Sequence, residues 1–105
     1  LFGTGAPLRQ FMYAGDLSRI IIDCAENDYD LNMNVAVPWN YSIKEMAEIA
    51  LKACDAEHLK INFDSSRPDG QYRKDASTDK FKKVFTDFEF TSLEEGIKKV
   101  YQKLQ

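Results

Sequence analysis

The chain is poor in the residues from which most metal and catalytic sites are built. It has one histidine, two cysteines and one tryptophan in 105 residues, and it contains no Cys-x-x-Cys pair. A zinc site would have few ligands to draw on, so we predict no metal. No apolar run approaches the ~20 residues of a membrane span, and no signal peptide is visible, so we expect no membrane partner.

An excess of either charge is also missing. Fourteen Lys and Arg stand against seventeen Asp and Glu, which gives a net charge of −3. General binding to nucleic acid needs a basic surface that displaces counterions, so we expect no nucleic-acid partner. Hydrophobic residues at 44% and charged residues at 30% are typical of a soluble globular protein. Because 105 residues suffice for one domain with a modest core, we predict that residues 1–105 form a single unit.

The two cysteines and the start of the chain each support one further expectation. Cys24 and Cys54 fall on the apolar faces of expected helices. This is typical of small buried hydrophobic residues in a reducing compartment, and we expect a cytoplasmic protein. The chain begins at Leu1 in an extended pattern and without a methionine, so we expect it to be a piece of a longer protein.

Two helices are expected in the first half of the chain. Asp16 opens the first, whose apolar residues recur at helical spacing until the polar cluster at residues 26–28. An acid in the first turn is favoured by the helix dipole. Ser42 and Glu45 form a capping box before the second helix, which we expect to reach Cys54.

Two more helices are expected near the end of the chain. Ser77 can cap the first of them. Thr91 and Glu94 form a second capping box, and the apolar stripe behind it extends to Leu104. Aromatic residues in this region are assigned to packing: Phe81, Phe85, Phe88 and Phe90.

Three short apolar segments are expected to be extended. They are residues 10–13, residues 34–37 and residues 59–64. The middle segment is stopped by Pro38, which has no amide hydrogen for a strand ladder. Together with the helices, these segments predict a mixed α/β fold.

Familiar catalytic patterns are absent. Residues 3–5 do not form a dinucleotide fingerprint, because Leu8 stands where the third glycine is required. None of the five tyrosines has a lysine four residues further on, which is the pair that short-chain dehydrogenases use. Cys54 and His58 could face each other across a helical turn, but a nucleophile pair also needs exposure and an orienting third group. We therefore predict no catalytic residue in this chain.

Two polar segments suggest an anion pocket. Residues 3–13 set Arg9 between a glycine-rich turn and an extended apolar run. Residues 67–74 contain a Pro-Asp-Gly turn followed by Arg73 and Lys74. A fixed guanidinium beside exposed backbone is one way in which proteins hold phosphate. We expect the two segments to be two walls of one pocket, in a substrate-binding region rather than a complete enzyme.

These motifs, taken in order, resemble a known enzyme family. Residues 3–17, with Arg9 inside, are similar to the carboxy-terminal half of extended short-chain dehydrogenase/reductases, in the NAD-dependent epimerase/dehydratase family, that act on nucleotide sugars. Residues 64–74 narrow the resemblance to members that epimerise and reduce a GDP-linked 4-keto-6-deoxy sugar with NADPH. The other motifs that fit are residues 42–45, Ser77, Lys80 and residues 90–91. The resemblance covers nearly the whole chain.

The resemblance implies a substrate-binding role for four residues. Phe2 stands at a substrate-binding position that is usually tryptophan, and Arg9 is expected on the diphosphate of a GDP-sugar. Asp69 is expected near the ribose or the guanine, where a carboxylate accepts hydrogen bonds from hydroxyls or ring donors. Lys74, next to Arg73, is expected to support the phosphates.

The same resemblance places the reaction chemistry outside this chain. The family's NADP-binding glycines, its Ser/Tyr/Lys catalytic set and its Cys/His acid–base pair belong to a Rossmann-type N-terminal domain that is absent here. The resemblance thus implies NADP in the missing part, no cofactor in this chain, and a homodimeric parent. Residues 34–37 and the helix from Asp16 are expected to return to the Rossmann sheet. An isolated chain would then expose apolar surface and open strand edges, and either dimerise or be marginally stable.

Two other functions remain open at this point. A related nucleotide-sugar epimerase or reductase, with a different base or sugar, would share the motif around Arg9. Preference for GDP over UDP would favour the GDP-sugar enzyme over this related enzyme. A non-catalytic binding or assembly module would bind no nucleotide at all.

Overall fold

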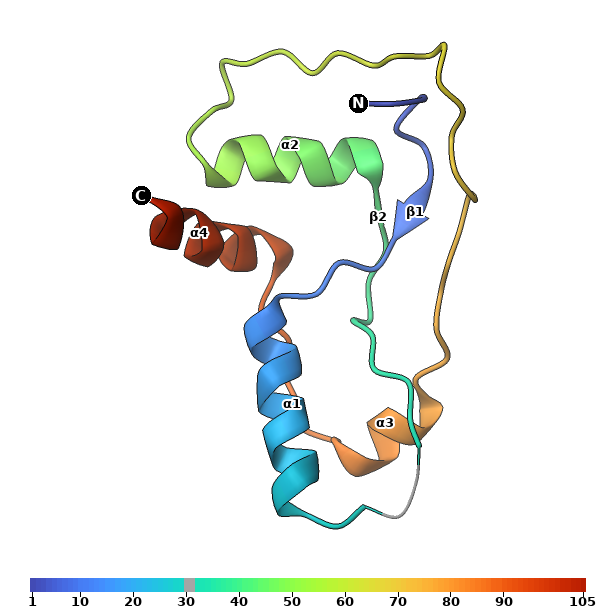
Figure 1. The fold of residues 1–105 in the computed structure, drawn as a ribbon, viewed down its shortest axis with the longest axis vertical. Helices are drawn as coiled ribbons and strands as arrows, with labels where there is room; N and C mark the ends of the chain where they lie inside the picture. Colours follow the sequence, from blue (N-terminus) through green and yellow to red (C-terminus); the bar gives the residue numbers. More distant parts are fainter. Residues whose placement is uncertain (30–31) are drawn as a thin grey trace.

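In the computed structural model, which describes residues 1–29 and 32–105, short elements are joined by long connections (Figure 1). The helices are α1 (Ala14–Glu26), α2 (Ile43–Ala53), α3 (Asp79–Val84) and α4 (Leu93–Leu104), and the strands are β1 (Leu8–Arg9) and β2 (Tyr41–Ser42). This is the α/β organisation that the sequence predicts. Among the described residues, no helix is both long enough and apolar enough to cross a membrane.

Three segments that are far apart in the sequence meet at β1. This strand pairs with β2 in antiparallel fashion, with Leu8 opposite Ser42 and Arg9 opposite Tyr41. Leu8 also forms an isolated parallel bridge with Arg73. Strands of two residues are too short to make a stable sheet by themselves. The pairing therefore serves to hold segments in register beside one another.

The predicted extended stretch at residues 10–13 lies just beyond a strand, since pairing occurs at Leu8–Arg9. The predicted strand at residues 59–64 is wrong for most of its length. Within residues 59–64 only Asp64 pairs, through an isolated parallel bridge to Phe2. An apolar extended run becomes a strand only where a neighbouring edge takes its ladder hydrogen bonds.

The predicted strand at residues 34–37 is also wrong, because this segment has no strand pairing in the part of the chain that the structure describes. Val37 is nevertheless only 1% exposed. Its carbonyl oxygen accepts a hydrogen bond from Nε2 of Gln10 at 3.0 Å, and Oε1 of Gln10 accepts from the Ala76 amide at 3.1 Å. A single side chain thus takes the place of a strand neighbour.

The first two helices follow their sequence signals. α1 begins two residues before Asp16 and ends at Glu26, inside the predicted polar cluster. At the start of α2 the Ser42 hydroxyl oxygen accepts from the Glu45 amide at 3.0 Å, as its capping motif predicts. α2 packs against α4.

The caps of α3 and α4 differ from the predictions. Ser92 caps α4, with its hydroxyl oxygen accepting from the Glu95 amide at 3.3 Å, so the prediction of Thr91 as the cap is wrong by one residue. The Thr91 side chain is directed instead to α1, where its hydroxyl donates to Oδ1 of Asp16 at 2.8 Å. α3 starts after Thr78 rather than after Ser77, and no side-chain cap bond forms there.

The apolar core of the described residues is small. Its buried side chains are Ile20, Val37, Ala53 and Phe81. The phenylalanines assigned to packing do lie together: ring centroids are 4.9 Å apart for Phe81 and Phe85, and 4.9 Å apart for Phe88 and Phe90. Aromatic contacts between α3 and the segment before α4 therefore make up much of this core.

The molecule is flat, with principal extents of 47 × 33 × 18 Å, and its outline is open (Figure 1). Its radius of gyration is 16.2 Å, whereas a compact domain of this length has about 13 Å. Its accessible surface is 7532 Å², whereas a folded monomer of this mass has about 6,000 Å². Large apolar side chains that are exposed include Leu17, Ile21, Ile22, Val100 and Leu104. The predicted exposure of apolar surface is therefore present.

Candidate functional site

The two polar segments that the sequence singles out lie against each other. The Thr4 amide donates to Oδ1 of Asp69 at 2.8 Å, and the Thr4 hydroxyl donates to Oδ2 at 2.7 Å. Further along, the Leu8 amide donates to the Tyr72 carbonyl oxygen at 2.7 Å. Residues 3–13 and residues 67–74, which we call the first and second walls, are thus joined at two points.

The first wall depends on two glycines with left-handed backbone. Gly3 has φ +77° and Gly5 has φ +79°, a region that other residues adopt only at a cost. A Cβ on Gly3 would lie 2.1 Å from Oδ1 of Asp69, and one on Gly5 would lie 2.6 Å from the Phe63 ring. Both the turn and the close approach of the second wall therefore require bare backbone here.

The first wall is also anchored to the start of α2. The Ile43 amide donates to the Pro7 carbonyl oxygen at 3.0 Å, and the Lys44 amide donates to the Gly5 carbonyl oxygen at 2.9 Å. These are amides of the first helical turn, which have no partner within a helix. Because they are already satisfied, they fix the wall and are not free to hold an anion.

Arg9 lies where the two walls meet. Its Nη1 donates to the Leu8 carbonyl oxygen at 2.7 Å. A Cβ on Gly70 would come within 3.3 Å of Nη2, so the guanidinium rests beside the backbone of the second wall. In the part of the chain that the structure describes, no carboxylate forms an ion pair with Arg9. A charged planar fork held by backbone is suited to binding two oxygens of a phosphate group.

Asp69 carries a stable negative charge on the second wall. Hydrogen bonds from the Thr4 side chain, and then from the Thr4 amide, hold the pKa of this carboxyl below its ordinary value. Because Thr4 is itself uncharged, it stabilises the charge of the carboxylate without cancelling it. The carboxylate can therefore accept further hydrogen bonds. Each of its oxygens has about two acceptor directions, and the contacts with Thr4 use one on each.

The other predicted site residues are exposed. Phe2 has 70% of its surface exposed, and the guanidinium carbon of Arg67 lies 5.1 Å from the centre of its ring. Lys74 is exposed in the second wall. Its neighbour Arg73 is paired, with Nε 2.5 Å from Oδ2 of Asp75, so Arg73 has much of its charge compensated.

Sequence reasoning missed three residues of this arrangement. They are Thr4, which fastens the walls; Gly70, which leaves room for the Arg9 side chain; and Arg67, which covers the Phe2 ring. Only the Gly-Thr-Gly string offered a signal for the first, since a threonine between two left-handed glycines projects from a tight turn. Gly70 lies beside Arg9, and Arg67 lies over Phe2. Both contacts join segments that are about sixty residues apart in the sequence.

A nucleotide cofactor does not fit the glycine turn. In dinucleotide-binding folds such a turn connects a strand to a helix whose N-terminus receives the pyrophosphate. Here residues 6–13 follow the turn without any helix. Within the described residues, no cluster of three or more His, Cys, Asp or Glu side chains could hold a metal ion.

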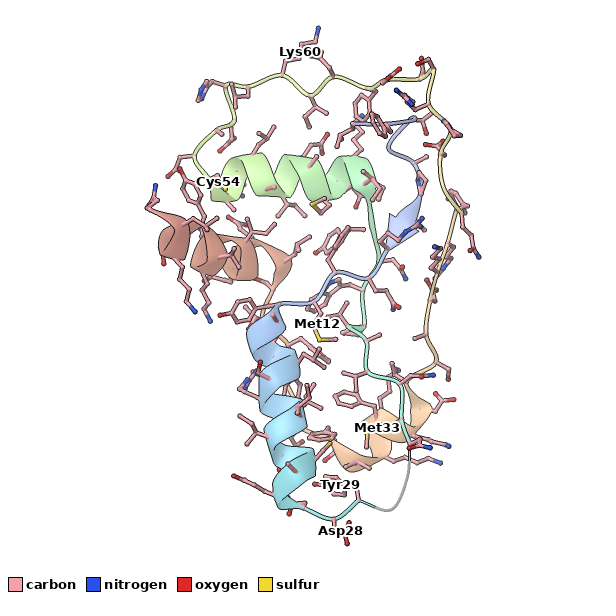
Figure 2. The ribbon with its side chains drawn as sticks, in the orientation of Figure 1. Met12, Asp28, Tyr29, Met33, Cys54 and Lys60 are labelled. Carbon is pink, nitrogen blue, oxygen red and sulfur yellow. The ribbon has the colours of Figure 1, made fainter. Side chains whose placement is uncertain are left out.

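Cys54 and His58 do not form a pair on one helical turn. α2 ends at Ala53, so Cys54 is its C-cap and His58 lies in the exposed turn beyond it. Figure 2 shows Cys54 at the end of α2 nearest to α4. Cys24 and Cys54 are both free thiols, and each is half-buried where the sequence suggests a small buried hydrophobic residue.

No protein-family model matches the chain, but it is similar to curated proteins named GDP-L-fucose synthase. A GDP-L-fucose synthase of Dictyostelium discoideum is 34% identical over 105 residues, covering 97% of this chain and 32% of that protein. A probable GDP-L-fucose synthase of Drosophila melanogaster is 35% identical over 104 residues, covering 92% of this chain and 31% of that protein. The chain thus spans about a third of the length of the curated relatives it matches.

Solved structures agree with these relatives. A GDP-L-fucose synthetase from Naegleria fowleri superposes with a TM-score of 0.86 at 32% identity, over 97% of this chain and 32% of that one. The same enzyme bound to NADP gives a TM-score of 0.85 at 33% identity. In both comparisons the matching region is the carboxy-terminal part of the longer proteins. By sequence and by fold, the chain is homologous to the carboxy-terminal third of the GDP-L-fucose synthases, and the predicted resemblance is confirmed.

Proposed function

We propose that this chain is the GDP-sugar-binding region of a GDP-L-fucose synthase, which converts GDP-4-keto-6-deoxy-D-mannose to GDP-L-fucose with NADPH. The observation that carries the proposal is the junction of the two walls. It brings Arg9, whose guanidinium has no ion pair among the described residues, and the hydrogen-bonded carboxylate of Asp69 onto segments that touch. Those two groups match the charged diphosphate and the donor-rich nucleoside of a GDP-sugar.

In this proposal each wall residue binds a different part of the ligand. Arg9 donates two parallel hydrogen bonds to the diphosphate, and Lys74 adds a second positive charge nearby. Asp69 accepts from a ribose hydroxyl or from the ring donors of guanine. Phe2 offers an exposed aromatic face to the sugar nucleotide.

The reaction itself belongs to the rest of the proposed parent enzyme. NADPH would supply the hydride when it is bound there, and the residues of this chain hold and orient the GDP-sugar. We propose that the chain is a single unit, 1–105, of a cytoplasmic homodimer. The poor fit of the glycine turn to a dinucleotide supports the division of roles.

A titration of the isotope-labelled chain with GDP, followed by NMR, tests the proposal. UDP is the matched control, since it has the same diphosphate and ribose but a pyrimidine with one ring donor in place of guanine. We expect saturable shifts at Arg9, Asp69 and Lys74 with GDP, and weaker ones with UDP. Equal response to both would favour a nucleotide-sugar enzyme with a different base. A folded chain that responds to neither would contradict nucleotide binding by this region.

A further inference from the structure

Thr4 makes three hydrogen bonds at the junction of the two walls. Its amide and its hydroxyl donate to the two separate oxygens of Asp69, at 2.8 Å and 2.7 Å. Its hydroxyl oxygen also accepts from the Ala6 amide at 3.2 Å. Because the Ala6 amide occupies an acceptor site of this oxygen, the hydroxyl hydrogen is left to point toward the carboxylate. Two donors on two oxygens fix both the place and the rotation of the carboxylate plane.

This arrangement lies on the surface and contributes nothing to the apolar core. Thr4 and Asp69 are both exposed. The bare backbone of Gly3 lets Oδ1 of Asp69 approach to a point 2.1 Å from where a Cβ would stand. Among the described residues Asp69 forms no ion pair, so its charge is not cancelled. A tightly oriented, uncancelled carboxylate at the surface is more than is needed to join two loops.

We propose that Thr4 is a positioning residue for nucleotide recognition: its two donors orient Asp69 so that the remaining acceptor sites of the carboxylate meet donors of the nucleoside. The inference rests on the proposed function, since it assigns Thr4 a part in selecting the GDP-sugar. Asp69 touches the ligand in this account, and Thr4 acts through Asp69. The backbone amide alone would leave the carboxylate free to rotate about a single hydrogen bond.

The test compares three variants with the wild-type chain. Thr4→Val keeps the side-chain shape and removes the hydroxyl, Thr4→Ser restores it, and Thr86→Val makes the same change at an exposed threonine beyond α3. The carboxyl pKa of Asp69, followed by carbon NMR, should rise toward its ordinary value in Thr4→Val alone. The affinity for GDP, measured by calorimetry, should fall on the order of tenfold in Thr4→Val and recover in Thr4→Ser. The preference for GDP over UDP should also fall in Thr4→Val and recover in Thr4→Ser.

The outcomes separate this inference from the proposed function. If the wild-type chain binds no nucleotide, both are wrong. If it binds GDP and Thr4→Val binds GDP equally well with equal preference over UDP, only the role of Thr4 is wrong. Circular dichroism confirms that each variant keeps its helices. Asp69→Asn provides a second approach should Thr4→Val not fold, because it removes the charge without changing the shape and should lower GDP affinity by a similar factor.

Discussion

Asp16 shows how much one side chain can do in a chain with so small a core. It is 1% exposed, although it lies in the first turn of α1, where the helix dipole favours an acid. Its carboxylate accepts from the Thr91 amide at 2.7 Å, from the Thr91 hydroxyl at 2.8 Å and from Nη2 of Arg19 at 2.9 Å. Asp16 therefore joins α1 to the segment that leads into α4.

We predict that Asp16→Asn destabilises the chain by about 2–3 kcal/mol, because charge-assisted hydrogen bonds are lost in a buried place. Urea unfolding measures the difference. Asp87→Asn, at an exposed turn position, is the control and should change the free energy of unfolding by less than about 0.5 kcal/mol. A similar small effect for Asp16→Asn would contradict a structural role for this carboxylate.

The pKa of Asp16 leads to a prediction of how the stability of the fold depends on pH. Burial raises the pKa of Asp16, but hydrogen bonds from Thr91 and Arg19 outweigh it, and the pKa lies below the ordinary 3.8. A lowered pKa in the folded state contributes stability above the unfolded-state value, and this is lost as the pH falls through the folded-state pKa. Unfolding curves of wild type and Asp16→Asn should therefore converge below pH about 4. Parallel curves down to pH about 3 would count against this.

At the scale of elements, helices can be read from this sequence far better than strands. α1 and α2 are predicted because capping and apolar spacing are local properties of the chain. The strand prediction at residues 34–37 fails because pairing depends on a neighbouring edge that sequence alone does not locate. The one-residue error at α4 has a similar cause, since the Thr91 hydroxyl donates to Asp16, 75 residues away.

The cap of α4 gives a prediction that distinguishes the two neighbouring hydroxyls. Ser92→Ala should cost about 1 kcal/mol and should fray the first turn of α4, because the Glu95 amide loses its acceptor. Thr91→Val should instead leave that turn intact and loosen the link to α1. Amide hydrogen exchange at Glu95 is the measurement. Faster exchange at Glu95 in Thr91→Val than in Ser92→Ala would show that Thr91 caps α4, as the sequence predicts.

The candidate site shows the same division between local and distant information. Arg9 and Asp69 could be proposed as site residues from their motifs, and the meeting of residues 3–13 with residues 67–74 could be predicted too. The sequence did not show that Asp69 would be held by Thr4, because that contact spans 65 residues. Nor did it show that Arg73 would be paired with Asp75, which leaves Lys74 as the more available charge.

At the scale of the whole molecule, the exposed apolar surface is the main physical problem. Leu17, Ile21 and Ile22 on α1 are 40%, 58% and 57% exposed. A groove of about 460 Å³ between α2, α4 and the segment entering α1 is lined mostly by apolar side chains, among them Met12 and Cys54 (Figure 2). Surface of this kind normally marks contact with another protein part.

We predict that the isolated chain self-associates through this surface or melts at low temperature. Replacing both Ile21 and Ile22 by Lys should raise the monomer fraction without loss of helix, as measured by sedimentation equilibrium. Leu59→Lys is the control, since Leu59 is 55% exposed in a connection away from α1. A wild-type chain with a monomeric mass, and with the same melting temperature at widely different concentrations, would contradict this prediction.

The measurement that tests the central claim most directly is calorimetric titration of GDP into the wild-type chain and into Arg9→Ala. Lys83→Ala is the matched control, because it removes one exposed positive charge from the end of α3, away from β1 (Figure 1). Loss of a charge-assisted pair of hydrogen bonds should weaken GDP binding at least tenfold in Arg9→Ala, and Lys83→Ala should bind like wild type. Equal weakening in both variants would mean that general charge, and not the junction of the two walls, attracts the nucleotide.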